Sequence, residues 1–178
     1  VESVIGTERL EKLVQGKSSI FEIESIMPLM EHVRQFEPKS IKSLANRIEQ
    51  ERIMVDHIRS ILFLIADGAP KPGHGGRARL MRKLVRGFLT AKKLLKISEP
   101  QFNHALVERV SDIYAEHHPA LMEARSLVLQ YILEESALFE RTLEKGIRQL
   151  DSLLQIQRDC LSAEDIVAIE KKLGVPSP

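Results

Sequence analysis

The sequence has little cysteine, few aromatic residues and no long apolar run, and each shortage argues against a class of protein. Cys160 is the single cysteine among 178 residues, so no disulfide can form within the chain and a zinc site built on thiolates is not expected. Tryptophan is absent and aromatic residues make up only 4% of the chain, which argues against strand-rich folds. The longest apolar run, residues 61–66, is too short to span a bilayer. We therefore expect a soluble protein of the reducing cytoplasm, without a secretory or membrane segment.

Apolar residues recur at helical spacing along most of the chain and predict an all-α fold, a multi-helix bundle with long helices around one core. The pattern places helices at residues 7–15, 23–36, 40–66, 77–95, 98–117, 121–153 and 162–173. Pro28 is compatible with the second helix only in its first turn. The third helix is almost wholly apolar at its end, which we expect to be buried.

The feature that points to function is a stretch without acidic residues, residues 68–98. It contains nine cations: Lys71, Arg77, Arg79, Arg82, Lys83, Arg86, Lys92, Lys93 and Lys96. Since these exceed the formal net charge of +1 by eight, the rest of the chain carries −8. A charge distribution this uneven is typical of a surface that binds a polyanion.

The acid-free stretch begins with a glycine-rich loop and continues as a basic helix. Four glycines and two prolines within residues 68–76 predict an exposed loop, with Gly73, His74, Gly75 and Gly76 at its end. In the following helix we expect Leu80, Leu84, Phe88, Ala91 and Leu95 on the core side. Arg79, Arg82, Lys83, Arg86 and Lys93 then form a stripe on the opposite side, with Arg77 at the start.

A glycine loop at a helix start followed by a one-sided row of cations suits phosphate binding, and we interpret it as a nucleic-acid surface. The alternative is an ordinary solvated helix face, although such faces normally mix both signs of charge. A membrane surface is disfavoured, because the apolar side of this helix resembles core and no tryptophan is present. His74 could donate to a phosphate or a base edge, or could be a plain exposed histidine.

No other constellation in the sequence carries a specific chemistry. The remaining histidines lack a carboxylate or cysteine at metal-ligand spacing, so we predict no metal site. The loop glycines match neither of the common phosphate-loop motifs. No serine or cysteine nucleophile has a recognisable activating partner, so we assign no catalytic residue within this segment.

Several segments together resemble the alanyl-tRNA synthetases, a family of class II aminoacyl-tRNA ligases. The segment VDHIRSILFLIADG, residues 55–68, is similar to a family signature at the end of a long helix almost residue for residue. The segments PGHGGR at 72–77 and LMRK at 80–83 resemble the following loop and its arginines, and FERTLEKGIRQLD at 139–151 resembles a glycine-bearing long helix. GTER at 6–9 and LVQGK at 13–17 are similar to the tail of class II motif 3, so the resemblance covers essentially the whole chain.

The resemblance implies two parts and an RNA partner. Residues 1–22 correspond to the C-terminal end of the class II catalytic domain and residues 23–178 to the helical domain that binds the tRNA acceptor arm. Arg9 occupies the place of the motif 3 arginine that contacts ATP phosphate. The implied partner is the acceptor stem of tRNA, that of tRNA-Ala, with no DNA. ATP and Mg²⁺ are implied for a full-length parent, and no cofactor for this segment.

This chain departs from the family at two positions that read a G·U base pair there. His74 stands where the family has a loop asparagine, and Lys171 stands near the family's second reader, an aspartate. Replacing a carboxylate by an ammonium reverses the sign presented to a base edge, so the ordinary G·U contact is not assumed. Class II motifs 1 and 2 and the editing zinc elements are also absent from these 178 residues.

The sequence therefore predicts a tRNA acceptor-arm binding domain of an alanine–tRNA ligase or of a related protein. In this hypothesis it supports ATP-dependent aminoacylation in the full-length protein and is not catalytic alone. A second hypothesis is a non-catalytic paralogue that acts as a protein-interaction or regulatory module, motivated by His74 and Lys171. A third, an unrelated helical adaptor, would need three separate local coincidences.

Overall fold

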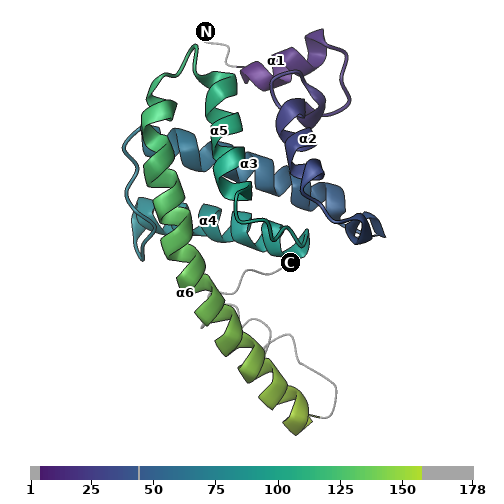
Figure 1. Cartoon of the computed structure of the whole chain (residues 1–178), viewed down its shortest axis with the longest axis vertical. Helices are drawn as coiled ribbons and strands as arrows, with labels where there is room; N and C mark the ends of the chain where they lie inside the picture. Colours follow the sequence, from purple (N-terminus) through teal and green to yellow (C-terminus); the bar gives the residue numbers. More distant parts are fainter. Residues whose placement is uncertain (1–4, 44, 158–178) are drawn as a thin grey trace.

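The computed structural model describes residues 5–43 and 45–157, and within these ranges the chain is helical and contains no β-strand. The prediction of an all-α fold is confirmed. The elements follow in the order α1 (Thr7–Val14), η1 (Ile20–Glu22), α2 (Met27–Gln35), η2 (Lys39–Ser43), α3 (Arg47–Ala66), α4 (Gly76–Leu94), α5 (Phe102–Tyr114) and α6 (Ala120–Gln157), as Figure 1 shows. None of the helices in this part of the chain is both long and apolar enough to cross a membrane.

Helix α3 lies at the centre of the fold and contacts α2, α4, α5 and α6 (Figure 1). Its last turns bury Ile58, Ile61, Leu62 and Ile65, which confirms that the apolar end of the third predicted helix lies in the core. Burying one such side chain contributes roughly 1.5–3 kcal/mol to stability. The hydrophobic effect therefore holds the surrounding helices against α3.

Helix α2 begins later than the sequence pattern predicted. The predicted helix covers residues 23–36, whereas α2 spans Met27–Gln35. Pro28 lies in the first turn of α2, where its missing N–H costs no hydrogen bond. Ile23 and Ile26 are fully buried by the turn that precedes this helix. The apolar spacing of these two residues therefore reflects their burial in the core, although they do not belong to the helix.

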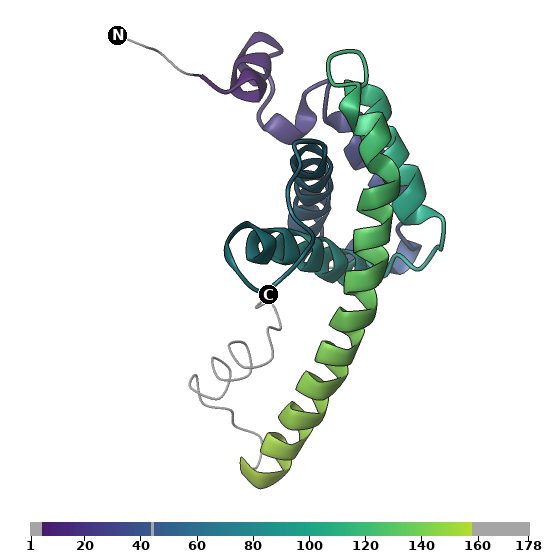
Figure 2. The same ribbon diagram turned by 90° about the vertical axis from the view of Figure 1, so that its left-hand side faces the viewer.

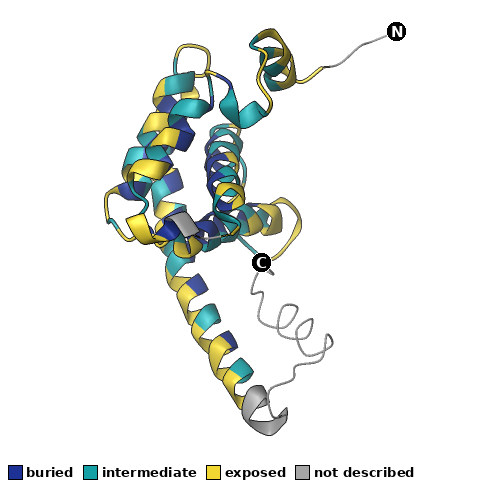
Figure 3. Ribbon diagram, turned by 90° about the vertical axis from the view of Figure 1, so that its right-hand side faces the viewer, coloured by how far each residue is buried: buried dark blue, intermediate teal, exposed yellow. Residues whose placement is uncertain are grey.

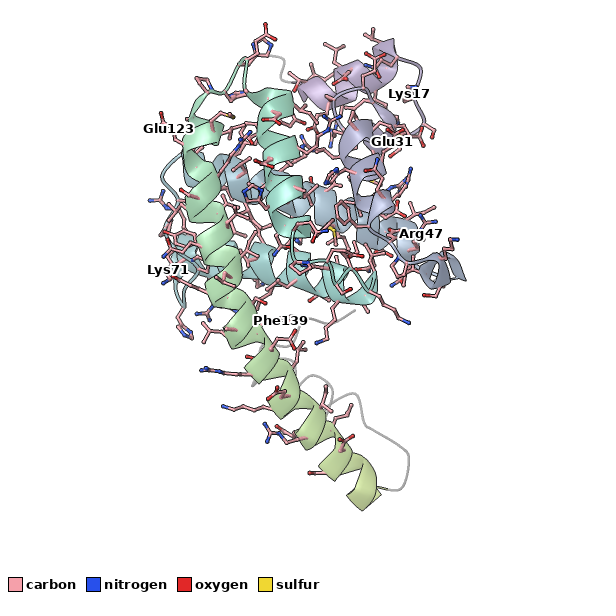
Figure 4. The ribbon with its side chains drawn as sticks, in the orientation of Figure 1. Lys17, Glu31, Arg47, Lys71, Glu123 and Phe139 are labelled. Carbon is pink, nitrogen blue, oxygen red and sulfur yellow. The ribbon has the colours of Figure 1, made fainter. Side chains whose placement is uncertain are left out.

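The helix predicted at residues 40–66 is divided into η2 and α3. Asn46, with φ −104° and ψ 23°, lies outside the helical region just before α3. The first residue of α3 is Arg47 (Figure 4), whose Nε lies 2.7 Å from Glu37 Oε2 and 2.9 Å from Glu51 Oε1. Both carboxylates are almost completely buried, and buried charges require a partner. The break brings Arg47 between them.

Helix α4 confirms the predicted basic helix, with one correction to its buried face. Met81, Val85 and Phe88 are buried in the core. Leu80, which the sequence pattern placed on the core side, is 53% exposed, so that prediction is wrong. Phe88, Ala91 and Leu95 of the predicted core side are buried, so the difference is confined to the start of the helix, where Met81, about 100° further around it, is buried instead of Leu80.

Helix α6 is 38 residues long and packs against α3, α4 and α5. Its buried apolar side chains extend from Leu121 to Phe139. Beyond Phe139 the helix continues away from the other described helices, as Figures 1 and 2 show. The helix predicted at residues 162–173 lies outside the described residues, as do Cys160 and Lys171.

Candidate nucleic-acid interface

The glycine-rich loop, residues 68–76, folds back onto the first turn of α4. Gly68 and Gly76 have φ values of 76° and 46°, in the left-handed region that glycine adopts without a steric penalty. Between them, the backbone N–H of Gly73 donates to the carbonyl oxygen of Ala78 over 2.9 Å. A Cβ at Gly73 would lie 3.0 Å from the Cβ of Ala78, so glycine is favoured where the loop folds back onto α4. The irregular loop is confirmed, and its backbone has a defined path.

The start of α4 carries neither acidic charge nor a side-chain cap. Gly75 is its N-cap residue and has no side chain that could cap the helix. The first turn contains no Asp or Glu. The first four N–H groups of a helix lack intrahelical partners, and the helix dipole adds partial positive charge at this end. An anion is therefore favoured at the end of α4 where Arg77 and Arg79 lie.

Three cations of α4 face α6 and form what we term the inner row: Arg82, Arg86 and Lys93. The Nε atoms of Arg86 and Arg82 lie 2.6 Å and 3.9 Å from Oε1 of Glu135. The Nζ of Lys93 lies 2.9 Å from Oε2 of Glu140. The single solvent-facing stripe predicted from the sequence is therefore divided, because α6 supplies acidic partners to one side of it.

Arg86 is held between two side chains of α6. Its side chain is only 15% exposed and that of Glu135 only 3%. The guanidinium carbon also lies 5.8 Å from the centroid of the Phe139 ring, within the range of a cation–π interaction. Hydrogen bonds between two charged groups are stronger than neutral ones. Arg86 thus joins α4 to α6.

Two other cations of the acid-free stretch also have partners. Lys71 lies beside α6 (Figure 4), with its Nζ 2.5 Å from Oε2 of Glu134. This hydrogen bond raises the pKa of Lys71 and lowers the pKa of Glu134. Lys92 donates to Oδ1 of Asn103 over 2.9 Å, and burial lowers the pKa of Lys92. Both lysines are thus engaged by the folded chain.

Arg79 and Lys83 form an outer row, which lies next to the inner row around α4. Both side chains are exposed, and their spacing of four residues puts them on one side of the helix. Neither forms an ion pair with any described residue, and the same holds for Arg77 at the helix start and Lys96 after its end. These exposed cations retain counterions that a polyanion would release.

His74 lies exposed in the loop and contacts the inner row. Its Nδ1 is 3.2 Å from Nη1 of Arg82. The loop is thus held in three places: at Lys71 by α6, at Gly73 by the backbone, and at His74 by Arg82.

Two site residues, Arg9 and Lys171, were suggested by resemblance alone. Arg9 lies in α1, where it is exposed and forms no ion pair with a described residue. Lys171 lies outside the described residues, so its predicted role remains untested. Across the part of the chain that the structure describes, no group of three or more His, Cys, Asp or Glu residues could hold a metal ion.

Comparison with protein families gives one match that covers nearly the whole chain. The model of the family described as tRNA synthetases class II (A) matches residues 2–177. This chain belongs to that family. The resemblance predicted from residues 55–68 and their neighbours is confirmed.

Three relatives, all alanine–tRNA ligases, also match this chain over nearly its whole length. The alanine–tRNA ligases of Streptococcus mutans serotype c, Streptococcus pyogenes serotype M18 and Streptococcus agalactiae serotype Ia are 30%, 32% and 31% identical to this chain over 180 residues. Each alignment covers 99% of this chain and 20% of the relative. The chain therefore spans about a fifth of the length of these curated relatives.

The sequence did not reveal the acidic residues of α6 that contact the basic surface of this class II (A) family member. These are Glu134, Glu135 and Glu140. A count of charge along the chain showed that residues 68–98 lack acids, but it gave no information about acids supplied by another helix. The only available signal was the clustering of these glutamates in the last long predicted helix.

Proposed function

We propose that this chain binds the acceptor arm of a tRNA, as the tRNA-recognition part of an alanine–tRNA ligase or of a related class II (A) protein. One observation carries the proposal: Arg77, Arg79 and Lys83 are exposed and have no acidic partner among the described residues, beside the glycine-rich loop and the uncapped start of α4. Backbone phosphates provide most of the affinity in RNA binding by such surfaces. The identity to alanine–tRNA ligases supports tRNA-Ala as the partner.

Within this proposal the predicted tRNA-binding residues have different tasks. Arg77, Arg79 and Lys83 bind phosphates. Arg82 and Arg86, which contact Glu135, hold α4 in position. The loop formed by Gly73, His74, Gly75 and Gly76 approaches a groove, where glycine lets the backbone come close. Lys171 provides a further contact.

We further propose that residues 1–22 end the catalytic domain and residues 23–178 form the helical tRNA-recognition domain. Helix α1 supports this division, because none of its residues is buried (Figure 3). Leu13 and Val14 are 69% and 79% exposed, so an apolar face of α1 remains for another domain to cover. Polar contacts join α1 to the rest of the described chain: Glu8 pairs with Arg59 of α3, and Glu11 accepts a hydrogen bond from Ser25, just before α2.

ATP and Mg²⁺, which the resemblance implies for a full-length parent, do not find a site in the described residues. Arg9 is a single exposed guanidinium, and no group of three or more His, Cys, Asp or Glu residues that could hold a metal ion lies among the described side chains. We therefore expect this chain to bind tRNA without aminoacylating it. The one cysteine and the tRNA partner both fit the cytoplasm.

Electrophoretic titration of the chain against tRNA at several salt concentrations tests the proposal. The logarithm of the association constant should fall linearly with the logarithm of salt concentration, with a slope of about −0.7 to −0.9 for each phosphate contact. Arg79→Ala and Lys83→Ala should each lower the slope by roughly 1. Arg109→Ala removes the same charge from an exposed site on α5 and should leave the slope unchanged.

The outcomes separate this proposal from the non-catalytic protein-interaction module. Binding that is absent at low salt, or that is indifferent to salt, overturns the proposal and favours the interaction module. Salt-dependent binding that Arg79→Ala and Arg109→Ala weaken equally would show that tRNA does not use the outer row.

A further inference from the structure

We infer that His74 presents its Nε2–H to RNA as a hydrogen-bond donor, and that Arg82 is the positioning residue that fixes this arrangement. The inference rests on the proposed function, because it concerns the same RNA. It assigns Arg82 to orienting the loop, in addition to its ion pair with Glu135. It also assigns the loop a defined chemical preference, for a hydrogen-bond acceptor.

The contact between Arg82 and His74 determines which ring nitrogen carries the proton. Nη1 of Arg82 lies 3.2 Å from Nδ1 of His74. A guanidinium has five N–H donors and no acceptor, so Nδ1 of His74 must accept. A neutral imidazole whose Nδ1 accepts carries its proton on Nε2. His74 is exposed, so this Nε2–H can reach a bound molecule.

Arg82 is placed to orient His74 and poorly placed to meet a phosphate. Its side chain is 20% exposed, and its Nε lies 3.9 Å from Oε1 of Glu135. That carboxylate partly offsets the charge of Arg82, although Arg82 Nε does not form a hydrogen bond to it at this distance. The Nη1 end of the guanidinium is directed to the loop. Arg79, by contrast, is exposed and has no ion pair with a described residue.

The group that His74 would bind is an acceptor atom of the RNA. Phosphate oxygens and base-edge acceptors share this chemistry. One net hydrogen bond contributes enough to change affinity by roughly three- to tenfold. The effect should be separable from the salt-dependent contribution of the outer row, because a neutral imidazole releases no counterion.

The first test requires no RNA. The histidines of the chain are labelled with nitrogen-15 for magnetic resonance. The ring signals that disappear in His74→Gln are those of His74. With the imidazole neutral, the Nδ1 signal should be that of an acceptor and Nε2 should carry the proton. Arg82→Ala should shift the Nδ1 signal, whereas Lys83→Ala, which removes a neighbouring cation, should not.

The second test measures tRNA affinity and its salt slope. His74→Ala should weaken binding roughly three- to tenfold with the slope unchanged. Arg82→Ala should weaken it by a similar factor, again without changing the slope, and the double variant should be no weaker than either single variant. His74→Gln should retain most of the affinity, because the glutamine amide places an N–H donor near the position of Nε2.

Hairpins that reproduce the acceptor stem, changed one base pair at a time, identify the acceptor. A loss in His74→Ala that is equal for all stems indicates phosphate, and a loss confined to one base pair indicates a base edge. Additive losses, or an Arg82→Ala slope lowered as in Arg79→Ala, overturn the inference by making Arg82 a phosphate contact. Salt-dependent binding with no loss in His74→Ala overturns it while leaving the proposed function intact. Absence of tRNA binding overturns the proposed function itself.

Discussion

The guanidinium of Arg86 in α4 is bonded to the carboxylate of Glu135 in α6, with Nε and Oε1 2.6 Å apart. The two residues are separated by 49 positions in the sequence. Their contact orients the inner row toward α6 and leaves the outer row exposed. The basic surface is therefore a product of two helices, although all of its cations belong to one segment.

Glu135→Gln should destabilise the chain. It removes the buried carboxylate that is bonded to the largely buried guanidinium of Arg86, which we expect to lower the free energy of unfolding by about 1–3 kcal/mol. Urea denaturation followed by helical circular dichroism measures this. Glu134→Gln at the neighbouring position, where the side chain is 36% exposed, is the control and should change the midpoint much less. Equal effects of the two variants would refute a structural role for the Arg86–Glu135 pair.

Glu140→Gln should strengthen tRNA binding. Lys93 and Glu140 are each about half exposed, and ion pairs of this kind contribute little to stability. Removing the carboxylate frees Lys93 for phosphate and removes a repulsion, so affinity should rise roughly two- to threefold at low salt. Glu123→Gln, at the start of the same helix (Figure 4), is the matched control. A gain that persists at high salt would contradict the electrostatic explanation.

Gly87→Ala should destabilise the contact between α3 and α4. A Cβ at Gly87 would lie 2.3 Å from Cε1 and 2.4 Å from Nδ1 of His57. Alanine is normally favoured over glycine within a helix, but displacing this half-buried ring should cost about 1–3 kcal/mol. In Gly87→Ala/His57→Ala the loss should be smaller than the sum of the two single losses, because the clash is gone. Thermal unfolding of the four proteins completes this cycle.

Stability should fall as the pH decreases below about 6.5, the ordinary pKa of histidine. Burial lowers the pKa of His57 and of His32 in the folded chain, with Asp56 opposing the shift at His57 and Arg109 adding to it at His32. The unfolded chain then binds more protons than the folded one between the lowered and the ordinary pKa. Protonation in that interval favours unfolding.

Urea denaturation at about pH 7.5 and about pH 5.5 checks this pH dependence. His57→Gln should show a smaller difference between the two pH values than the parent chain. His117→Gln, which removes an exposed histidine, should preserve the difference. Burial raises the pKa of Glu37, so this residue stabilises the folded chain as the pH falls through its own, lower titration range. Glu37 is present in every variant, so comparing the variants isolates the contribution of His57.

The parts of the fold that depend on apolar periodicity could be predicted from the sequence. Ile58, Ile61, Leu62 and Ile65 recur at helical spacing and are buried together, since spacing alone puts them on one face. The division of residues 40–66 could not be predicted in this way. It depends on the buried carboxylates of Glu37 and Glu51, which become neighbours of one arginine only after the chain folds.

The candidate site was predictable in its position but not in its internal organisation. Residues 68–76 form the irregular loop that their glycines and prolines predicted, and the basic helix follows it. Leu80 and Met81 show the limit of this approach: both are apolar, and only packing against α3 and α6 selects Met81 for the core. A one-residue difference rotates the helix enough to move cations between solvent and a neighbouring helix.

By itself, the sequence determined that this protein is helical, that its positive charge is concentrated in residues 68–98, and that it belongs to the class II (A) tRNA synthetase family. Helical spacing, composition and residue identity are local properties of the chain. The tertiary structure decided which cations remain available. Arg86 is bonded to the buried Glu135, whereas Arg79 is exposed and has no ion pair with a described residue, because electrostatic interactions depend on distance in space and on burial.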